Sequence, residues 1–215
     1  MSDFFFTLLE LTDQGKRDLE RVPKVDRMVY AGLSRDEYEE FLHDLYHIVW
    51  HFCPAMAAAA SLMDESLLGV RDHLFWSIED ENGHHRLVLD DVAAIGGSVT
   101  RAKNSSPHPA VRGMIAYNYD TPARSHPAAI LGMLYTLEVV SSVYGGRVAV
   151  SIARQLGMDA DGPGFTFLSS HATMDQDHMA RLNTTLKAVT EPKAQSAIVE
   201  SANTNWWFLR EMMQD

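Results

Sequence analysis

The sequence contains a single cysteine, Cys53, in 215 residues. One cysteine excludes an internal disulfide and a zinc site built from CxxC pairs, and it favours a reducing compartment, so we expect a cytoplasmic protein. Basic residues are also scarce, since 18 Lys and Arg against 29 Asp and Glu leave a formal charge of −11. Nucleic-acid binders and proteins that dock on anionic lipid need a basic surface, so we expect neither kind of partner.

Signals for membrane insertion or export are lacking as well. The longest stretch without Asp, Glu, Lys or Arg, residues 45–63, contains His47, His51 and Pro54, which favours a buried helix over a membrane span. The apolar start of the chain carries Asp3 and Glu10 without a basic segment, a poor match to a signal peptide. The composition, 46% hydrophobic and 22% charged, is typical of a globular protein with a sizeable core.

Sustained alternation of apolar and polar residues is absent, whereas helical spacing recurs between turn signals. Ser34 and Glu37 have the spacing of a capping box that begins a helix. We therefore expect an all-α, single-domain bundle of about seven helices that spans residues 1–215. The expected helices cover residues 4–22, 34–63 with a kink at Pro54, 65–95, 110–117, 128–156, 165–189 and about 190–213, with polar loops at 98–109 and 119–127.

The first candidate for a site is the segment HATMDQDH, residues 171–178. A helix turns about 100° per residue, so His171, Asp175 and His178 fall within roughly 60° of one another on one face. Two imidazoles and a carboxylate that converge in this way suit a divalent first-row metal such as iron, manganese or zinc. A solvated polar helix face is the alternative that this segment alone leaves open.

A second segment, EDENGHH at residues 79–85, places Glu81 and His84 at i,i+3 positions of a helix. Glu-x-x-His is the element that di-iron carboxylate bundles carry on two helices, with single Glu residues on two others. Glu138 lies in an apolar helix, where a carboxylate is costly unless it is paired, for example with Arg147, or binds a metal. Six candidate ligands for two metals result, with Glu138 as the natural bridge: Glu81, His84, Glu138, His171, Asp175 and His178.

A further set of residues is a candidate for the wall of a substrate cavity. His43, His47 and His51 follow one another at four-residue spacing and form a stripe along the helix expected at 34–63. Core histidines with satisfied hydrogen bonds are the alternative interpretation. Gly145 and Gly146 interrupt the helix expected at 128–156, and each glycine costs about 1 kcal/mol relative to alanine there. Such glycines indicate a kink, or a close approach of the backbone to a ligand or to another helix.

Four stretches resemble, in the same order, the non-heme diiron oxidase and oxygenase branch of the heme-oxygenase-like superfamily. They are YEEFLHDLYHIVWHFCP (38–54), EDENGHHRLVLDDVAAIGG (79–97), LGMLYTLEVVSSVYGGRVAVSIARQLG (131–157) and FTFLSSHATMDQDHM (165–179). The resemblance implies a heme-oxygenase-like helical fold with metal ligands at the six positions above. It also implies a cofactor of two irons, with manganese as the alternative, and O2 as co-substrate. The expected substrate is a small organic molecule: a fatty acid, an amino acid or an amine.

Two other functions stay open within the same fold. The segment YTLEVVSSVYGGRV also resembles the distal helix of bacterial heme oxygenases, but their proximal histidine on the first helix has no counterpart before His43. The second alternative is a metal-binding or ligand-binding member without catalytic activity. Trp206 and Trp207 near the end of the chain are interpreted either as the contact of a homodimer or as core packing.

Overall fold

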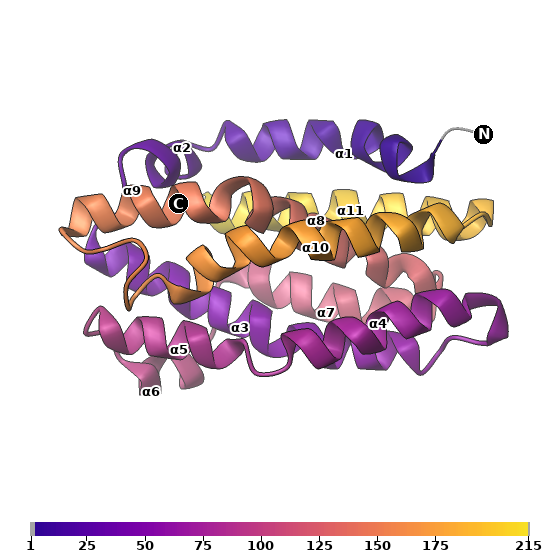
Figure 1. The fold of residues 1–215 in the computed structure, drawn as a ribbon, viewed down its shortest axis with the longest axis horizontal. Helices are drawn as coiled ribbons and strands as arrows, with labels where there is room; N and C mark the ends of the chain where they lie inside the picture. The colour runs from indigo at the N-terminus through magenta and orange to yellow at the C-terminus, as the bar shows by residue number, and fades with distance from the viewer. Residues whose placement is uncertain (1–2, 215) are drawn as a thin grey trace.

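The computed structural model describes residues 3–214, and for residues 172–176 it describes the backbone only. These residues form eleven α-helices, two short 3₁₀ segments and one π-helical segment, without a β-strand in the described part of the chain. Figure 1 shows the long helices running side by side along the long axis of the molecule. The helices are α1 Phe4–Glu20, α2 Pro23–Tyr30, α3 Arg35–Ala60, α4 Leu68–Glu81, α5 His85–Ala94, α6 Val99–Asn104, α7 Pro109–Arg124, α8 Ile130–Val140, α9 Gly146–Leu156, α10 Thr166–Ala188 and α11 Pro192–Met213. The all-α prediction is confirmed.

The number of helices exceeds the expected seven because turn residues divide two of the expected helices, and because α2 and α6 form where no helix was expected. Pro23 begins a separate helix, α2, after α1 has ended at Glu20. The stretch expected as one helix from 65 to 95 is two, since Gly83 adopts a φ of 106° that a helix does not allow. The π-helical segment Ser141–Gly145 separates α8 from α9, at the glycines that the sequence marks as an interruption.

The two polar loops are more helical than expected. Residues 98–109 contain α6, because the Ser98 side chain accepts a hydrogen bond from the Arg101 amide and caps the helix. Helix α7 continues past residue 117 to Arg124 and includes Pro122, which is buried in the bundle. Elsewhere the expected signals hold: Ser34 and Glu37 form the predicted capping box of α3, and Pro54 lies inside that helix.

Helix α8 lies in the centre of the molecule and carries Glu138. Seven consecutive residues, Ile130–Thr136, are buried, and α8 packs closely against α11. A Cβ on Gly132 would stand 2.6 Å from the Ala202 amide nitrogen, so glycine is required for this approach. The stretch Pro127–Leu156 is long and apolar enough to cross a membrane, but 67% of its most apolar window is buried inside the bundle, as in a core helix.

Candidate metal centre

The site begins at the break between α4 and α5. Glu81 is the last residue of α4 and is buried, and the turn through Gly83 returns the chain so that the His84 amide donates to the Glu81 carbonyl oxygen at 3.1 Å. In this turn the His84 Nδ1 atom lies 2.7 Å from Glu81 Oε2. The two residues thus meet as the spacing predicted, but through a glycine turn rather than along one helix face.

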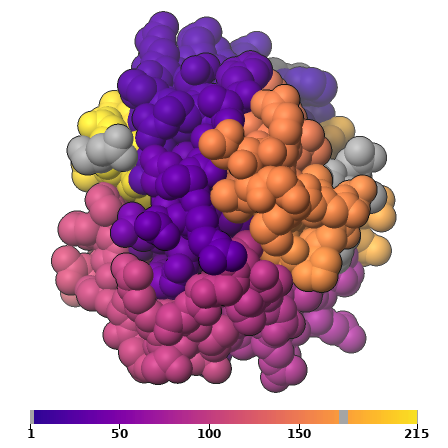
Figure 2. Space-filling view, turned by 90° about the vertical axis from the view of Figure 1, so that its left-hand side faces the viewer, coloured from indigo at the N-terminus to yellow at the C-terminus, as the bar shows by residue number. Residues whose placement is uncertain are grey.

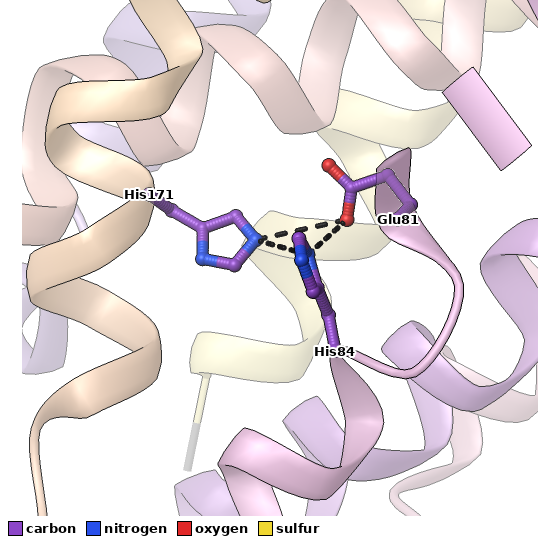
Figure 3. A group of neighbouring side chains, drawn as sticks. All are labelled: Glu81, His84 and His171. Atoms are coloured by element: carbon purple, nitrogen blue, oxygen red, sulfur yellow. Dashed lines mark hydrogen bonds and ion pairs between the residues drawn. The ribbon is translucent and has the colours of Figure 1, made fainter. Parts of the chain in front are cut away.

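His171 on α10 completes the first group of ligand atoms, which Figure 3 shows. Its Nε2 atom lies 3.2 Å from His84 Nδ1 and 3.7 Å from Glu81 Oε2. Its other nitrogen, Nδ1, lies 2.8 Å from the Phe167 carbonyl oxygen. Because a carbonyl oxygen only accepts, Nδ1 carries the proton in this contact, and Nε2 is left to present its lone pair to the group.

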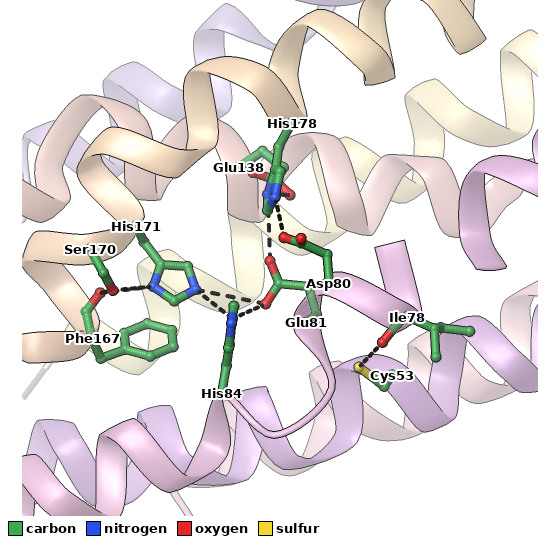
Figure 4. A network of polar contacts seen from close by, with 10 residues as sticks. All are labelled: Cys53, Ile78, Asp80, Glu81, His84, Glu138, Phe167, Ser170, His171 and His178. Atoms are coloured by element: carbon green, nitrogen blue, oxygen red, sulfur yellow. Dashed lines mark hydrogen bonds and ion pairs between the residues drawn. The ribbon is translucent and has the colours of Figure 1, made fainter. Parts of the chain in front are cut away.

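A second group forms on the other oxygen of the same carboxylate, as Figure 4 shows. His178 Nδ1 lies 3.4 Å from Glu81 Oε1 and 3.3 Å from Glu138 Oε1 on α8. The opposite ring nitrogen, Nε2, lies 2.8 Å from Asp80 Oδ2. Glu81 is therefore the carboxylate that faces both groups, a position that the sequence interpretation assigned to Glu138.

Five of the six candidate ligands lie together in this way: Glu81, His84, Glu138, His171 and His178. The sixth, Asp175, lies outside the described side chains. Asp80 is an addition that the sequence reasoning missed, because nothing in the acidic run of residues 79–81 distinguishes it from Glu79. Arg147, the alternative partner of Glu138, instead donates to the Tyr30 hydroxyl at 2.9 Å.

The two groups set ionised carboxylates beside imidazole rings. Burial alone would raise the pKa of Glu81, but the His171 and His84 rings beside the carboxylate outweigh this effect and hold the pKa at about 2. The hydrogen bond to Glu138 raises the pKa of His178 to about 9 against the opposing effect of burial, and Asp80 and Glu81 add to the increase. A buried carboxylate is thus kept ionised, and a proton on His178 supplies the balancing positive charge.

An apolar cavity of about 160 Å³ adjoins the ligand atoms. Glu81, Glu138 and His171 contribute to its wall, together with Ser141 and Tyr144 of the π-helical segment. Among the described residues, its remaining wall includes no lysine or arginine and is formed mainly by aliphatic, aromatic and methionine side chains from α1, α2, α3, α8, α9, α10 and α11. Its volume and lining suit an uncharged apolar group, since an engineered apolar cavity of about 150 Å³ holds benzene.

The candidate cavity residues occupy different places in the structure. Gly145 lies in the cavity wall, whereas Gly146 begins α9 outside the lining. The α3 residues that face the cavity are Phe41, Leu45, Ile48, Val49 and Phe52.

The three histidines of the stripe point away from this face of α3. The His43 Nε2 atom lies 3.3 Å from Glu39 Oε1, and His51 Nδ1 lies 3.2 Å from the Tyr119 hydroxyl of α7. His47 contacts the backbone of Ala102 and Ser105 at α6. The structure therefore does not bring His43, His47 and His51 to the cavity beside the ligand atoms.

The family model for iron-containing redox enzymes matches residues 39–209, which includes every residue of both groups. The chain belongs to this family. Membership agrees with the donor atoms of the site, because imidazole nitrogens and carboxylate oxygens are ligands that iron accepts. The single thiol is not among them: burial raises the pKa of Cys53 to about 11, and its Sγ atom lies 4.0 Å from the Ile78 carbonyl oxygen.

Solved structures show the heme-oxygenase-like fold of the chain. A domain of unknown function from Shewanella denitrificans is 20% identical with a TM-score of 0.87, covering 99% of this chain and 91% of that one. A TenA homologue from Pseudomonas syringae is 14% identical with a TM-score of 0.82, covering 98% and 90%. Heme oxygenase-1 from the cyanobacterium Synechocystis, solved with heme, is 14% identical with a TM-score of 0.78, covering 98% and 90%. No curated protein matches the chain in sequence.

Proposed function

We propose that the protein is a non-heme diiron oxidase or oxygenase that uses O2 to oxidise a small organic substrate. The observation that carries this proposal is the position of Glu81, whose two carboxylate oxygens each face a separate group of nitrogen and oxygen donors. In one group the His84 Nδ1 atom is close to two acceptor atoms, and in the other group the His178 Nδ1 atom is. Each of these two nitrogens can carry a proton that faces both neighbouring acceptors. A metal cation in place of each proton would be bound by the same nitrogen and the same two neighbours.

Each residue has a distinct part in this proposal. Glu81, His84 and His171 would hold one ion. Glu81, Glu138 and His178 would hold the other. The resemblance adds Asp175 as the sixth ligand. Iron bound here would supply the redox chemistry with O2, while the protein supplies orientation and a site shielded from water. Phe167 and Asp80 orient the rings of His171 and His178 through hydrogen bonds to the nitrogens that face away from Glu81.

The cavity limits the substrate more than the ligand set does. In the described part of the chain its wall includes no lysine or arginine that could pair with a free carboxylate, and its size suits an apolar group of roughly six to eight carbons by comparison with a cavity of about 150 Å³ that holds benzene. We therefore propose a substrate with one polar group at the metal centre and an apolar remainder in the cavity. A medium-length fatty acid or a simple alkylamine fits this description better than a zwitterionic amino acid with a polar side chain.

The test is anaerobic titration of the purified protein with Fe(II), followed by O2 uptake with octanoate, octylamine, leucine and glutamine. We expect two irons per chain and faster O2 uptake with octanoate or octylamine than without substrate. Iron uptake without accelerated O2 consumption with any compound would favour a binding protein.

A second experiment adds hemin to the protein. We expect no ligated heme, since α1 contains no histidine that could bind the metal of a heme. A ligated-heme absorption band and turnover to a bile pigment would identify a heme oxygenase instead.

The same proposal includes the compartment and the partners. The single half-buried cysteine suits the cytoplasm, and the partners are the small-molecule substrate and a second copy of the chain in a homodimer. Trp206 is a core residue with 1% exposure, while Trp207 is 48% exposed and is the member of the pair that a homodimer would cover.

A further inference from the structure

Asp91 is a buried carboxylate on α5 with no part in the two groups described above. It is 1% exposed, and among the described residues its hydrogen-bond donors are backbone amides rather than basic side chains. Its Oδ1 atom accepts hydrogen bonds from the amides of Gly164 at 3.1 Å and Thr166 at 2.9 Å. Its Oδ2 atom accepts from the amide of Phe167 at 2.8 Å. Both oxygens are thus used by the chain segment that begins α10.

This contact supplies the cap that α10 lacks in its own sequence. The first amides of a helix have no partner within the helix, and Phe165 at the cap position has no side chain that could accept from them. Asp91 satisfies the first two from a neighbouring helix, and a carboxylate is the favoured group at this end of the helix dipole. From α3, the Tyr38 hydroxyl donates to the Gly164 carbonyl oxygen at 2.8 Å, and its ring stacks on Phe165.

The same two helices position His84 and His171, whose ring nitrogens lie 3.2 Å apart in the candidate metal centre. His84 directly precedes α5 and Asp91 follows two turns later, while on α10 the capped residue Phe167 precedes His171 by one turn. Phe167 joins the two contacts, because its amide donates to Asp91 and its carbonyl oxygen accepts from His171 Nδ1. The Phe167 ring also stacks on the His171 ring, with centroids 4.0 Å apart.

Figure 2 shows the end of the molecule at which this contact lies, with the chain that leads into α10 in orange between segments from the first and second quarters of the sequence. We propose that Asp91 is a positioning residue of the metal centre: by capping α10 from α5, it sets the register in which His84 and His171 face one another. The proposal rests on the proposed function, since it concerns the ligands assigned there.

The experiment compares Fe(II) affinity among variants of the full chain, under anaerobic conditions. Asp91→Asn keeps the size of the side chain but places an amide nitrogen against at least one backbone N–H. The cap of α10 is therefore weakened. We expect about 10- to 100-fold weaker binding of Fe(II) at one of the two sites, the range seen when partners of metal ligands are removed. Asp90→Asn, at the exposed neighbouring position, is the matched control and should bind as the parent does.

A second control separates positioning from general loss of stability. Asn205→Ala breaks the buried pair of hydrogen bonds between Asn118 and Asn205, at 2.8 and 3.1 Å, on helices α7 and α11, away from the ligands. It should lower the melting temperature without changing Fe(II) affinity. If Asp91→Asn likewise loses stability and keeps the parental affinity, Asp91 is only a structural cap and the proposal is overturned. If Asp91→Asn does not fold, Tyr38→Phe loosens the same segment and should weaken Fe(II) binding in the same direction.

A measurement without metal distinguishes this proposal from the proposed function. In ¹⁵N NMR spectra of the metal-free protein, the His171 ring should lose its fixed Nδ1–H form in Asp91→Asn and keep it in Asn205→Ala. A parent chain that binds no Fe(II) would refute the metal centre, while the NMR comparison would still decide the role of Asp91. Unchanged His171 signals together with unchanged affinity in Asp91→Asn would refute the positioning role alone.

Discussion

The two sides of the Glu81 carboxylate hold their histidines by different means. On one side, His171 is fixed by the Phe167 carbonyl oxygen, a neutral backbone group whose position follows from the start of α10. On the other side, His178 lies among the carboxylates of Asp80, Glu81 and Glu138 and is fixed by charge. A backbone contact keeps its geometry whether or not a cation is present, whereas a cluster of like charges needs a cation to remain together. The geometry of the first side is therefore preorganised. The geometry of the second side depends on whether a proton or a metal ion supplies the positive charge.

The largest effect should follow from a change in the residue that both sides share. In Glu81→Gln the side chain loses its charge and turns an NH2 group toward one of the two groups, so both should lose affinity. We expect iron content to fall from two ions per chain to none, measured by elemental analysis after anaerobic loading. Glu79→Gln, two residues earlier on the exposed surface, should keep both ions. A Glu81→Gln protein with two irons would show that Glu81 is not a ligand.

A change on the charged side alone should affect one ion. Asp80→Asn replaces the carboxylate that accepts from His178 Nε2, so this ring loses part of its orientation. We expect about 10- to 100-fold weaker binding of one Fe(II) and unchanged binding of the other. Anaerobic titration should show two separated steps, and Asp72→Asn on the same helix should show none of this separation. Equal weakening of both steps would mean that the two sides are not independent.

The two faces of α3 allow a comparison that does not involve a metal, and the expected effect is smaller. Val49 lies in the cavity wall, and a phenylalanine there would fill space that an apolar ligand needs. Benzene, followed by NMR titration, should bind to the parent and to His47→Ala, but weakly or not at all to Val49→Phe. Loss of benzene binding in His47→Ala would place the histidine stripe at the cavity after all.

The smallest expected difference is a single proton in the metal-free protein. The pKa of His178 is raised to about 9, so its ring should carry both protons at pH 7.5 and lose one as the pH rises through 9. A raised pKa in the folded state stabilises the fold below the ordinary value of about 6.5 for histidine, and this stabilisation is lost as the pH rises through 9. ¹⁵N NMR at pH 7.5 should therefore show His178 doubly protonated. A singly protonated His178 at pH 7.5 would show that charge does not fix this ring among the neighbouring carboxylates.

Local signals in the sequence predicted most of the helices and indicated most of the residues that the structure brings together in the candidate metal centre. Ser34 and Glu37 identify the start of α3, and apolar periodicity identifies the helices of the bundle, because these signals act within a few residues of the chain. The Glu-x-x-His and His-x-x-x-Asp-x-x-His spacings collected the ligand candidates for the same reason. Gly83 shows the limit of this reasoning: its left-handed conformation divides a helix that periodicity predicts as continuous, yet it still brings Glu81 and His84 together.

Only the packing of distant segments decided the rest. It placed Glu81 rather than Glu138 between the two groups, it turned His43, His47 and His51 away from the cavity, and it opened that cavity between helices from both ends of the chain. Asp91 and Asp80 have no distinguishing neighbours in sequence, and their partners, Phe167 and His178, lie 76 and 98 residues away. A sequence specifies which side chains share a helix face. Which helix that face meets depends on how all the apolar faces are buried together, a property of the whole fold.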